Sequence, residues 1–134
     1  MRGKELFFGE RGECFHCHDG LFFTNNRFAN NGTFIEGGDE GRQRVTQRLL
    51  DQGRFRVPSL RNIAVTAPYM HDGSIATLSE VIEHYDQGGR GHPSTDPTIR
   101  PLQLTAQEKA DLLAFLGALT DESFLRDPRF APGK

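Results

Sequence analysis

The sequence predicts a helical domain made of short helices and long loops. Two stretches, Thr77–Glu80 and Thr105–Glu108, match the capping box that opens a helix, and an amphipathic run follows each of them. No βαβ pattern is visible. The 134 residues include 15 glycines and 7 prolines and are only 36% hydrophobic, so we expect one domain in which loops take much of the chain.

The first third of the chain carries weak helix signals. Residues 3–10 predict a short helix, which Gly9 and Gly12 weaken because glycine is a poor helix former. Residues 19–53 are rich in asparagine and glycine, which favour turns. We therefore expect an extended, turn-rich segment there, with one brief helix around residues 45–50.

The two capping boxes open helices with clear apolar stripes. Apolar or aromatic side chains recur at i, i+3, i+4 and i+7 in both, at Leu78, Val81, Ile82 and Tyr85 and at Leu112, Phe115, Leu116 and Leu119. Tyr85 therefore shares the inward face of its helix, which the glycines at 88 and 89 end. Residues 88–101 predict a long loop, and the Pro-punctuated tail from about 121 to 134 is expected to lie across the surface.

The segment ECFHCH contains both cysteines of the chain. Cys14, Cys17 and His18 form a Cys-x-x-Cys-His motif, whose spacing lets both sulfurs reach the vinyl groups of a haem while the imidazole binds the iron. The motif therefore predicts one covalent haem c per chain, with two thioethers and with His18 as the proximal ligand. His16, between the cysteines, is expected to neighbour solvent or a haem propionate.

Three other uses of such a cysteine pair are a zinc half-site, a thioredoxin-like redox pair and a structural disulfide. Zinc requires further ligands, and the chain has no second cysteine pair. A redox pair is expected beside a βαβ pattern. Haem c is therefore the favoured cofactor, and its porphyrin would add the apolar core that the composition lacks. Four phenylalanines are expected to cover the haem edge: Phe22, Phe23, Phe28 and Phe34.

Charge and hydropathy argue against two classes of partner. The net charge is −2, with 16 basic and 18 acidic residues mixed along the chain, so we expect neither a nucleic-acid-binding surface nor a polybasic anchor. No apolar run approaches the length of a signal peptide or a membrane span. Haem attachment of this type is typical of the bacterial periplasm. We therefore expect a periplasmic protein, with a signal peptide and a further domain upstream of Met1.

The segment FRVPSLRNIAVTAPYMHDGSIATLSEVIEHYDQGG, with the upstream ECFHCH and the downstream LTAQEKADLLAFLGALT, covers nearly the whole chain. In this order, these motifs resemble the C-terminal haem domain of the bacterial di-haem cytochrome c peroxidase and MauG family. The resemblance implies an all-α, cytochrome c-like domain over residues 1–134, with short helices and long loops wrapped around one covalent haem c. In the family, such a domain occurs twice in a full-length chain.

The resemblance also implies an axial ligand on the second face of the iron. Met70 is one candidate, because His/Met ligation is common in cytochromes c. The position that matches the axial ligand of the family is Tyr85, however, and MauG-type enzymes carry tyrosine there. We expect Tyr85 to bind the iron and Met70 to line the haem pocket. The alternative is that Met70 is the ligand and Tyr85 is a buried core aromatic.

Thr66 and Pro68 match positions of the family whose backbone carbonyls bind calcium between the two domains. Two carbonyls cannot complete a calcium shell of six to eight ligands, so we expect calcium binding to depend on the other domain. The alternative is an ordinary proline-containing turn.

Three more polar side chains are considered as possible neighbours of the haem. Arg61 and His71 are candidates for positions near the haem propionates, and structural surface contacts are the alternative for both. His84 is expected to be solvated.

The number of haem motifs limits the function that the resemblance implies. The family binds peroxide at a haem in its N-terminal domain, which has its own Cys-x-x-Cys-His, and a tryptophan bridges the two haems. This chain has one such motif and no tryptophan. We therefore expect the electron-transfer half of a haem peroxidase-family oxidoreductase, with no catalytic residue of its own. Its expected partners are the N-terminal peroxidatic haem domain, a small redox donor protein and, for the intact enzyme, hydrogen peroxide.

Two other functions remain as alternatives. The first is a free-standing monohaem cytochrome c that carries electrons without a catalytic partner. The second is a zinc-binding or disulfide-stabilised interaction module, which would contain no covalent haem.

Overall fold

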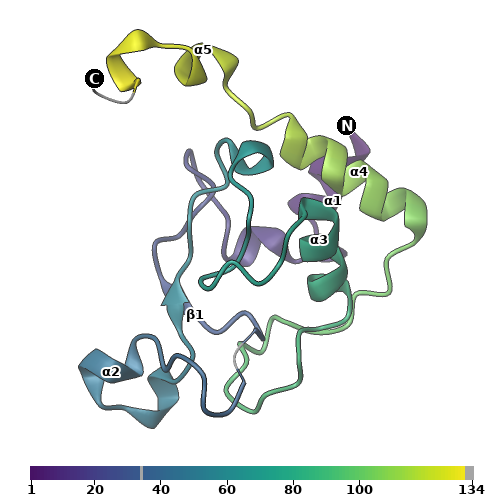
Figure 1. Cartoon of the computed structure of the whole chain (residues 1–134). Coiled ribbons are helices and arrows are strands. Elements are labelled where there is room, and N and C mark those ends of the chain that lie inside the picture. The colour runs from purple at the N-terminus through teal and green to yellow at the C-terminus, as the bar shows by residue number, and fades with distance from the viewer. Residues whose placement is uncertain (34, 132–134) are drawn as a thin grey trace.

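The computed structural model describes residues 1–33 and 35–131, and Phe34, expected at the haem edge, lies outside them. Figure 1 shows short helices joined by long loops, as the sequence predicts. None of the helices in the described ranges is long and apolar enough to cross a membrane. The elements are the α-helices α1 Arg2–Phe7, α2 Gln43–Thr46, α3 Leu78–Asp86, α4 Ala106–Gly117 and α5 Glu122–Leu125, the 3-10 turns η1 Cys14–His16, η2 Leu49–Asp51, η3 Ile63–Val65 and η4 Pro128–Phe130, and the strands β1 Phe28–Ala29 and β2 Phe55–Arg56.

The helices α3 and α4 begin at the two capping boxes. Thr77 Oγ1 accepts a hydrogen bond from Glu80 N at 3.2 Å, and Glu80 Oε2 accepts one from Thr77 N at 2.8 Å. Thr105 and Glu108 repeat this arrangement at 3.2 and 2.7 Å. Each pair satisfies backbone donors that the start of a helix leaves free. The predicted end of α3 is also confirmed, since the helix stops at Asp86, shortly before the glycines.

The core lies where α1, α3 and α4 pack together, which joins helices from both ends of the chain. The contact between α1 and α4 is so close that a Cβ atom on Gly3 would lie 1.9 Å from Asp111 O, so glycine is required there. Phe7 is 1% exposed, and its ring packs against the rings of Phe8 and Phe115 at centroid distances of 5.0 Å. The buried apolar core consists of Phe7, Tyr69, Leu78, Ile82, Leu102, Leu104, Leu112 and Leu116.

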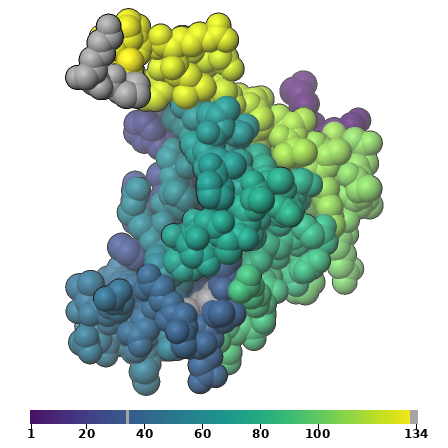
Figure 2. Space-filling model, in the orientation of Figure 1, coloured from purple at the N-terminus to yellow at the C-terminus, as the bar shows by residue number. Residues whose placement is uncertain are grey.

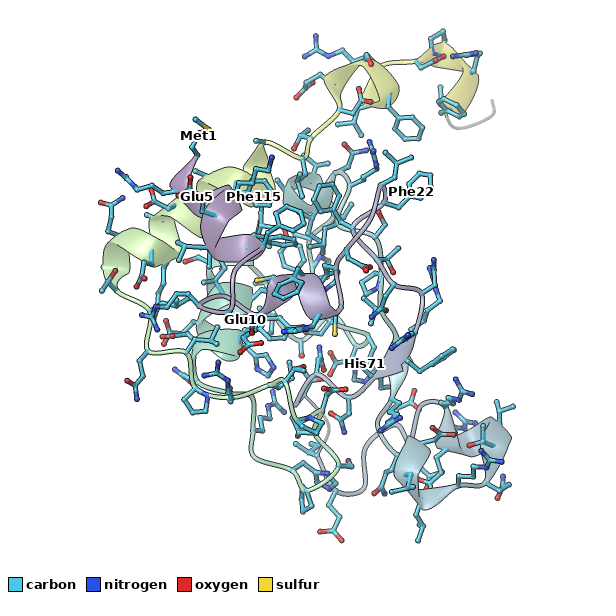
Figure 3. All side chains as sticks on the ribbon, turned by 180° about the vertical axis from the view of Figure 1, so that it is seen from behind. Met1, Glu5, Glu10, Phe22, His71 and Phe115 are labelled. Atoms are coloured by element: carbon cyan, nitrogen blue, oxygen red, sulfur yellow. The ribbon has the colours of Figure 1, made fainter. Side chains whose placement is uncertain are left out.

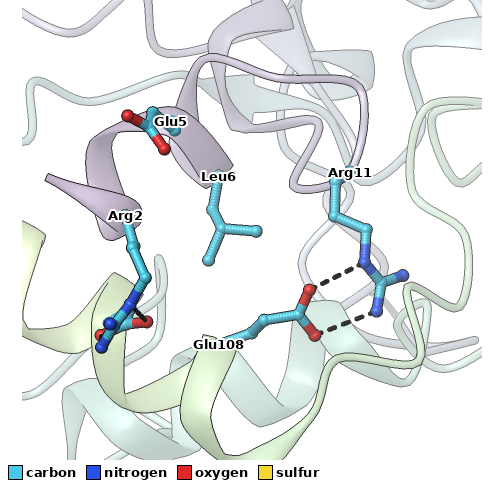
Figure 4. Close-up of a pocket in the computed structure, with 6 residues that line it drawn as sticks. Arg2, Glu5, Leu6, Arg11 and Glu108 are labelled. Atoms are coloured by element: carbon cyan, nitrogen blue, oxygen red, sulfur yellow. Dashed lines mark hydrogen bonds and ion pairs between the residues drawn. The ribbon is translucent and has the colours of Figure 1, made fainter.

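Ion pairs hold α1 and the loop after it to α4 around an open hollow of 330 Å³ (Figure 4). Arg11 donates from Nε and Nη2 to the two carboxylate oxygens of Glu108, at 3.0 Å each, and from Nη2 to Gln103 O at 2.8 Å. Arg2 Nε donates to Asp111 Oδ2 at 2.7 Å. The hydrogen bonds from Arg11 lower the pKa of Glu108 to about 2. Because these four charges are already paired with one another, we attribute the hollow to helix packing and not to ligand binding.

A two-stranded sheet adds to the helices that the sequence predicts. The strands β1 and β2 are antiparallel, with Phe28 opposite Arg56 and Ala29 opposite Phe55. Strands of two residues leave no alternating pattern in the sequence, so only the folded chain reveals them.

The helix expected around residues 45–50 is present as two shorter turns, α2 and η2, on a loop that leaves and rejoins the body. Arg42 N donates to Arg54 O at 2.9 Å and closes the base of this loop. The helix is interrupted because Gln47 has a φ of 58°, a left-handed conformation that ends α2.

The described part of the C-terminal tail, residues 121–131, does not lie across the surface, contrary to the prediction. Figures 1 and 2 show it as a separate arm that projects from the end of α4. Asp121 Oδ1 accepts from Phe124 N at 3.0 Å, and Asp127 Oδ1 accepts from Arg129 N at 2.9 Å, so each short turn has its own cap. The rings of Phe124 and Phe130 pack together at 4.7 Å. The tail thus forms local structure of its own.

Candidate haem site

The Cys-x-x-Cys-His segment forms a tight loop that is held from both sides. After the η1 turn, His18 N donates to Cys14 O at 2.9 Å. Asn25 closes the loop from the other side, with its N donating to Cys17 O at 2.9 Å and its Nδ2 to His16 O at 3.0 Å. Both thiols and the imidazole therefore belong to one ordered loop, which follows Glu10 in the chain (Glu10 is labelled in Figure 3).

Both cysteines are free thiols and half-buried. Cys14 packs against the apolar core, and its Sγ lies 3.2 Å from Gly12 O. Burial raises the pKa of the Cys14 thiol to about 12 and also raises the pKa of Cys17. Burial in apolar surroundings thus favours the neutral form of both thiols. Half-buried, neutral sulfurs beside an apolar core suit covalent attachment to an apolar macrocycle.

A group of metal-ligating atoms lies next to this loop and does not include the cysteines. Among the described residues, only Glu10, Glu13 and His16 place three such atoms within 4.8 Å of one another. His16 Nε2, expected near solvent or a propionate, lies 2.9 Å from Glu13 Oε2. In the part of the chain that the structure describes, no such group includes the two thiols, which argues against the zinc alternative.

His18 is oriented by the segment that follows it. Its Nδ1 lies 3.0 Å from Phe23 O. Because a carbonyl oxygen only accepts, Nδ1 carries the proton, and Nε2 keeps its lone pair for a metal. Burial lowers the pKa of His18, while the carbonyls of Phe23 and Pro58 act in the opposite direction, so the imidazole is neutral at pH 7. Thr24 Oγ1 donates to Val57 O at 2.7 Å and fastens this loop to the segment that contains Pro58.

Met70 and Tyr85, the two candidates for the second axial position, lie beside one side chain. Asn31 Nδ2 is 3.2 Å from Met70 Sδ and 3.4 Å from Tyr85 Oη. Tyr85 lies in the last turn of α3, and burial raises its pKa to about 12, an effect that the Asn31 hydrogen bond opposes. The Met70 backbone has a φ of 73°, a strained conformation for methionine. A thioether and a phenol from different segments therefore converge on one amide.

Sequence reasoning missed Asn31, although the asparagine before Gly32 and Thr33 is typical of a turn. The Asn31 loop packs closely against the end of α3, where a Cβ atom on Gly32 would lie 2.9 Å from Gly89 Cα. His84 Nε2 lies 2.9 Å from Asn31 O, and His84 is half-buried. The expectation that His84 is solvated is therefore wrong, because this loop covers it.

Arg61 and His71 occupy well-defined places, and their role near the haem propionates stays a prediction. Arg61 donates to Leu21 O from Nε at 3.1 Å and from Nη2 at 2.8 Å, and its guanidinium lies 5.5 Å from the centre of the Phe22 ring. It thus lies beside the segment that follows the haem motif. His71 follows Met70 in the chain, and its ring stacks on the ring of Phe55 in β2 at a centroid distance of 3.8 Å.

The three described phenylalanines of those expected at the haem edge, Phe22, Phe23 and Phe28, do not form one group. Phe23 packs 5.9 Å from Phe7 and partly covers the α1–α4 core. Phe22 and Phe28 are exposed, at 59% and 39%, and Arg42 lies over the Phe28 ring at 4.5 Å. Each of these two exposed rings therefore has an arginine guanidinium over its face, in a cation–π contact.

Thr66 and Pro68, the predicted calcium ligands, lie at the surface after η3. Within the described part of the chain, neither carbonyl oxygen accepts a hydrogen bond. Both oxygens are thus available to a ligand from outside, as a site shared with another domain requires.

The Cytochrome c family model matches residues 1–120. The chain belongs to the cytochrome c family. The predicted fold class is thereby confirmed, with the small sheet as its one addition among the described residues. As a cytochrome c domain, the chain has haem c as its cofactor, and the Cys-x-x-Cys-His loop, the neutral His18 imidazole and the thiols fit this group.

The relatives of this cytochrome c domain include proteins named cytochrome c peroxidase and MauG. It is 35% identical to the cytochrome c peroxidase IdrP1 of Pseudomonas sp. (strain SCT), over 99% of this chain and 43% of that protein. It is 37% identical to the methylamine utilization protein MauG of Methylorubrum extorquens, over 90% of this chain and 34% of that protein. These matches confirm the resemblance to di-haem cytochrome c peroxidases and MauG. The chain spans less than half the length of the curated relatives that it matches.

Two solved structures have the same fold. The crystal structure of a MauG-like protein associated with microbial copper homeostasis superposes with a TM-score of 0.90 at 44% identity, over 97% of this chain and 49% of that one. The diheme peroxidase BthA from Burkholderia thailandensis superposes with a TM-score of 0.78 at 22% identity, over 93% and 43%. The match to BthA shows the shared fold alone.

Proposed function

We propose that this chain is the electron-transfer domain of a MauG-like di-haem oxidoreductase. It would hold one haem c through Cys14, Cys17 and His18, with Tyr85 as the second axial donor. When bound, the haem supplies one-electron redox chemistry. The residues of the chain attach it, orient the imidazole and present a second donor.

The observation that best supports this function is the presence of two separate donor sets. His18 offers Nε2 because its Nδ1 is bound to Phe23 O. Tyr85 Oη and Met70 Sδ lie beside the Asn31 amide, on segments that are distant in sequence from the motif. With one donor from each set bound to the iron, the chain would leave no open position for peroxide. Such a domain passes on or stores oxidising equivalents and leaves O–O cleavage to another haem.

Tyr85 is the second donor that we favour over Met70. A phenolate is a hard, anionic oxygen donor, which stabilises ferric and more oxidised iron, whereas a thioether stabilises ferrous iron. Ligation by Tyr85 should therefore lower the reduction potential. A low potential suits a domain that stores oxidising equivalents.

Two measurements test this proposal. A pyridine haemochrome spectrum of the denatured holo-protein should show one covalent haem c per chain, and its absence would rule out both this function and the monohaem carrier. Tyr85→Phe should convert a six-coordinate ferric spectrum into a five-coordinate or newly ligated one. Met70→Leu should leave the spectrum nearly unchanged. The reverse result for the two variants would refute ligation by Tyr85.

A second haem domain is the main partner that we propose. The relatives named cytochrome c peroxidase and MauG are more than twice as long as the part that this chain matches. In the intact enzyme, an N-terminal haem domain would bind hydrogen peroxide, and a small redox protein would donate electrons, in the bacterial periplasm. Peroxide turnover should require such a domain. Electron transfer that does not depend on it would favour the free-standing monohaem carrier.

Calcium is a further ligand that we propose for the intact enzyme. The exposed carbonyls of Thr66 and Pro68 provide two hard oxygen donors, and the remaining ligands would come from the other domain and from water. Calorimetric titration with calcium should therefore show weak binding to this chain alone and tighter binding when the second domain is present.

A further inference from the structure

The orientation of the Asn31 amide is determined by its neighbours. Thr33 N and Thr33 Oγ1 lie 3.3 and 2.7 Å from Asn31 Oδ1. A backbone N–H group only donates, so the atom that faces it must be the carbonyl oxygen of the side chain. The NH₂ group of Asn31 therefore faces Met70 and Tyr85.

The backbone of Asn31 is held as firmly as its side chain. His84 Nε2 lies 2.9 Å from Asn31 O, and Thr33 is only 5% exposed. His84 and Tyr85 are consecutive residues in the last turn of α3. The turn that carries the phenol thus also holds the loop that carries the amide, so the distance between the two groups is built into the fold.

One amide donates to two competing ligands, and the consequences differ. A hydrogen bond to a phenolate oxygen stabilises its negative charge, and hydrogen bonds to charged groups are stronger than neutral ones. A hydrogen bond to the Met70 sulfur occupies a lone pair of the kind that would bind iron. The Asn31 amide therefore favours ligation by the phenolate of Tyr85 and disfavours ligation by the thioether of Met70.

We propose that Asn31 is the positioning residue that selects Tyr85 over Met70 as the second axial ligand of the haem iron. This inference rests on the proposed haem c function. Asn31 acts through the two candidate ligands, by the hydrogen bonds that its NH₂ group makes to both of them.

The test compares Asn31→Leu with the wild type in the holo-protein of the whole chain. Leucine has a similar volume but no N–H group, so the Met70 sulfur is released and the phenolate loses its donor. We expect the ratio of thioether-ligated to phenolate-ligated haem to rise about tenfold or more, which corresponds to one hydrogen bond to a charged group. Electron paramagnetic resonance and resonance Raman spectra report this ratio, and the reduction potential should rise with it.

Two further variants separate the hydrogen bonds from general damage to the loop. Gln107→Leu is the matched control, because Gln107 is exposed on α4 and its amide donates to Asp111 at 3.2 Å and to neither candidate ligand. Its spectrum should equal that of the wild type. Thr33→Val removes the hydroxyl group, which makes the shorter of the two hydrogen bonds that orient the Asn31 amide, so it should shift the ratio in the same direction, by less than Asn31→Leu does. This variant decides the question if Asn31→Leu fails to fold.

The possible results distinguish this inference from the proposed function. Wild-type spectra and potentials for Asn31→Leu and Thr33→Val, together with a changed spectrum for Tyr85→Phe, would overturn the role of Asn31 and leave ligation by Tyr85 intact. An equal shift in Gln107→Leu would also overturn it. An unchanged spectrum for Tyr85→Phe would instead refute the ligand assignment itself.

Discussion

Phe7 is the side chain on which the packing of α1 depends most. It is 1% exposed, and its ring meets those of Phe8, Phe23 and Phe115 at 5.0, 5.9 and 5.0 Å. Phe7→Ala should leave a cavity, because α1 cannot move closer to α4 past the contact at Gly3. Substitutions of this kind cost about 3–5 kcal/mol. Since small domains are stable by only about 5–15 kcal/mol, this variant should lose a large part of its free energy of unfolding.

Guanidinium denaturation of the holo-protein, followed by far-UV circular dichroism, measures this loss, and a thermal scan should show a Tm lower by roughly 10–20 °C. Phe8→Ala is the matched control. It makes the same substitution one residue later, but Phe8 is 42% exposed, so we expect a loss of about 1 kcal/mol. Equal losses in the two variants would refute the conclusion that burial of Phe7 anchors α1.

Three further predictions concern α4 and the segments that pack against it. Gly3→Ala should destabilise the protein, because the new Cβ atom would lie 1.9 Å from Asp111 O. Gly117→Ala should stabilise it by about 0.5–1 kcal/mol, because alanine is a better helix former and open space surrounds Gly117 in α4. Thermal denaturation measures both effects. Acid should weaken the contact as well. Hydrogen bonds from Arg11 lower the pKa of Glu108 from 4.5 to about 2, so the stability that this pair contributes is complete above pH 4.5 and is lost as the pH falls through 2. Arg11→Met should remove this part of the pH dependence, and an unchanged slope of unfolding free energy between pH 4.5 and 2 would contradict the reasoning.

The sequence by itself determined the helix starts, the attachment loop and the phase of α3. The capping boxes at Thr77 and Thr105 join residues three positions apart, so they can be recognised from the local sequence alone. The Cys-x-x-Cys-His motif is equally local. The period of α3 places Tyr85 on the inward stripe of the helix, because a phase of 3.6 residues per turn depends only on residues within two turns.

Only the tertiary structure decided which distant residues these elements contact. Asn31 and Tyr85 are 54 positions apart, and no spacing or period in the sequence connects them. His84 looks like a solvated residue in the sequence, yet the Asn31 loop covers it. Local propensity likewise does not predict that β1 pairs with β2. Nor does it predict that the tail projects from the body and makes few contacts with it. Such contacts arise from shape and hydrogen bonding between distant segments, and these become defined only when the core has packed.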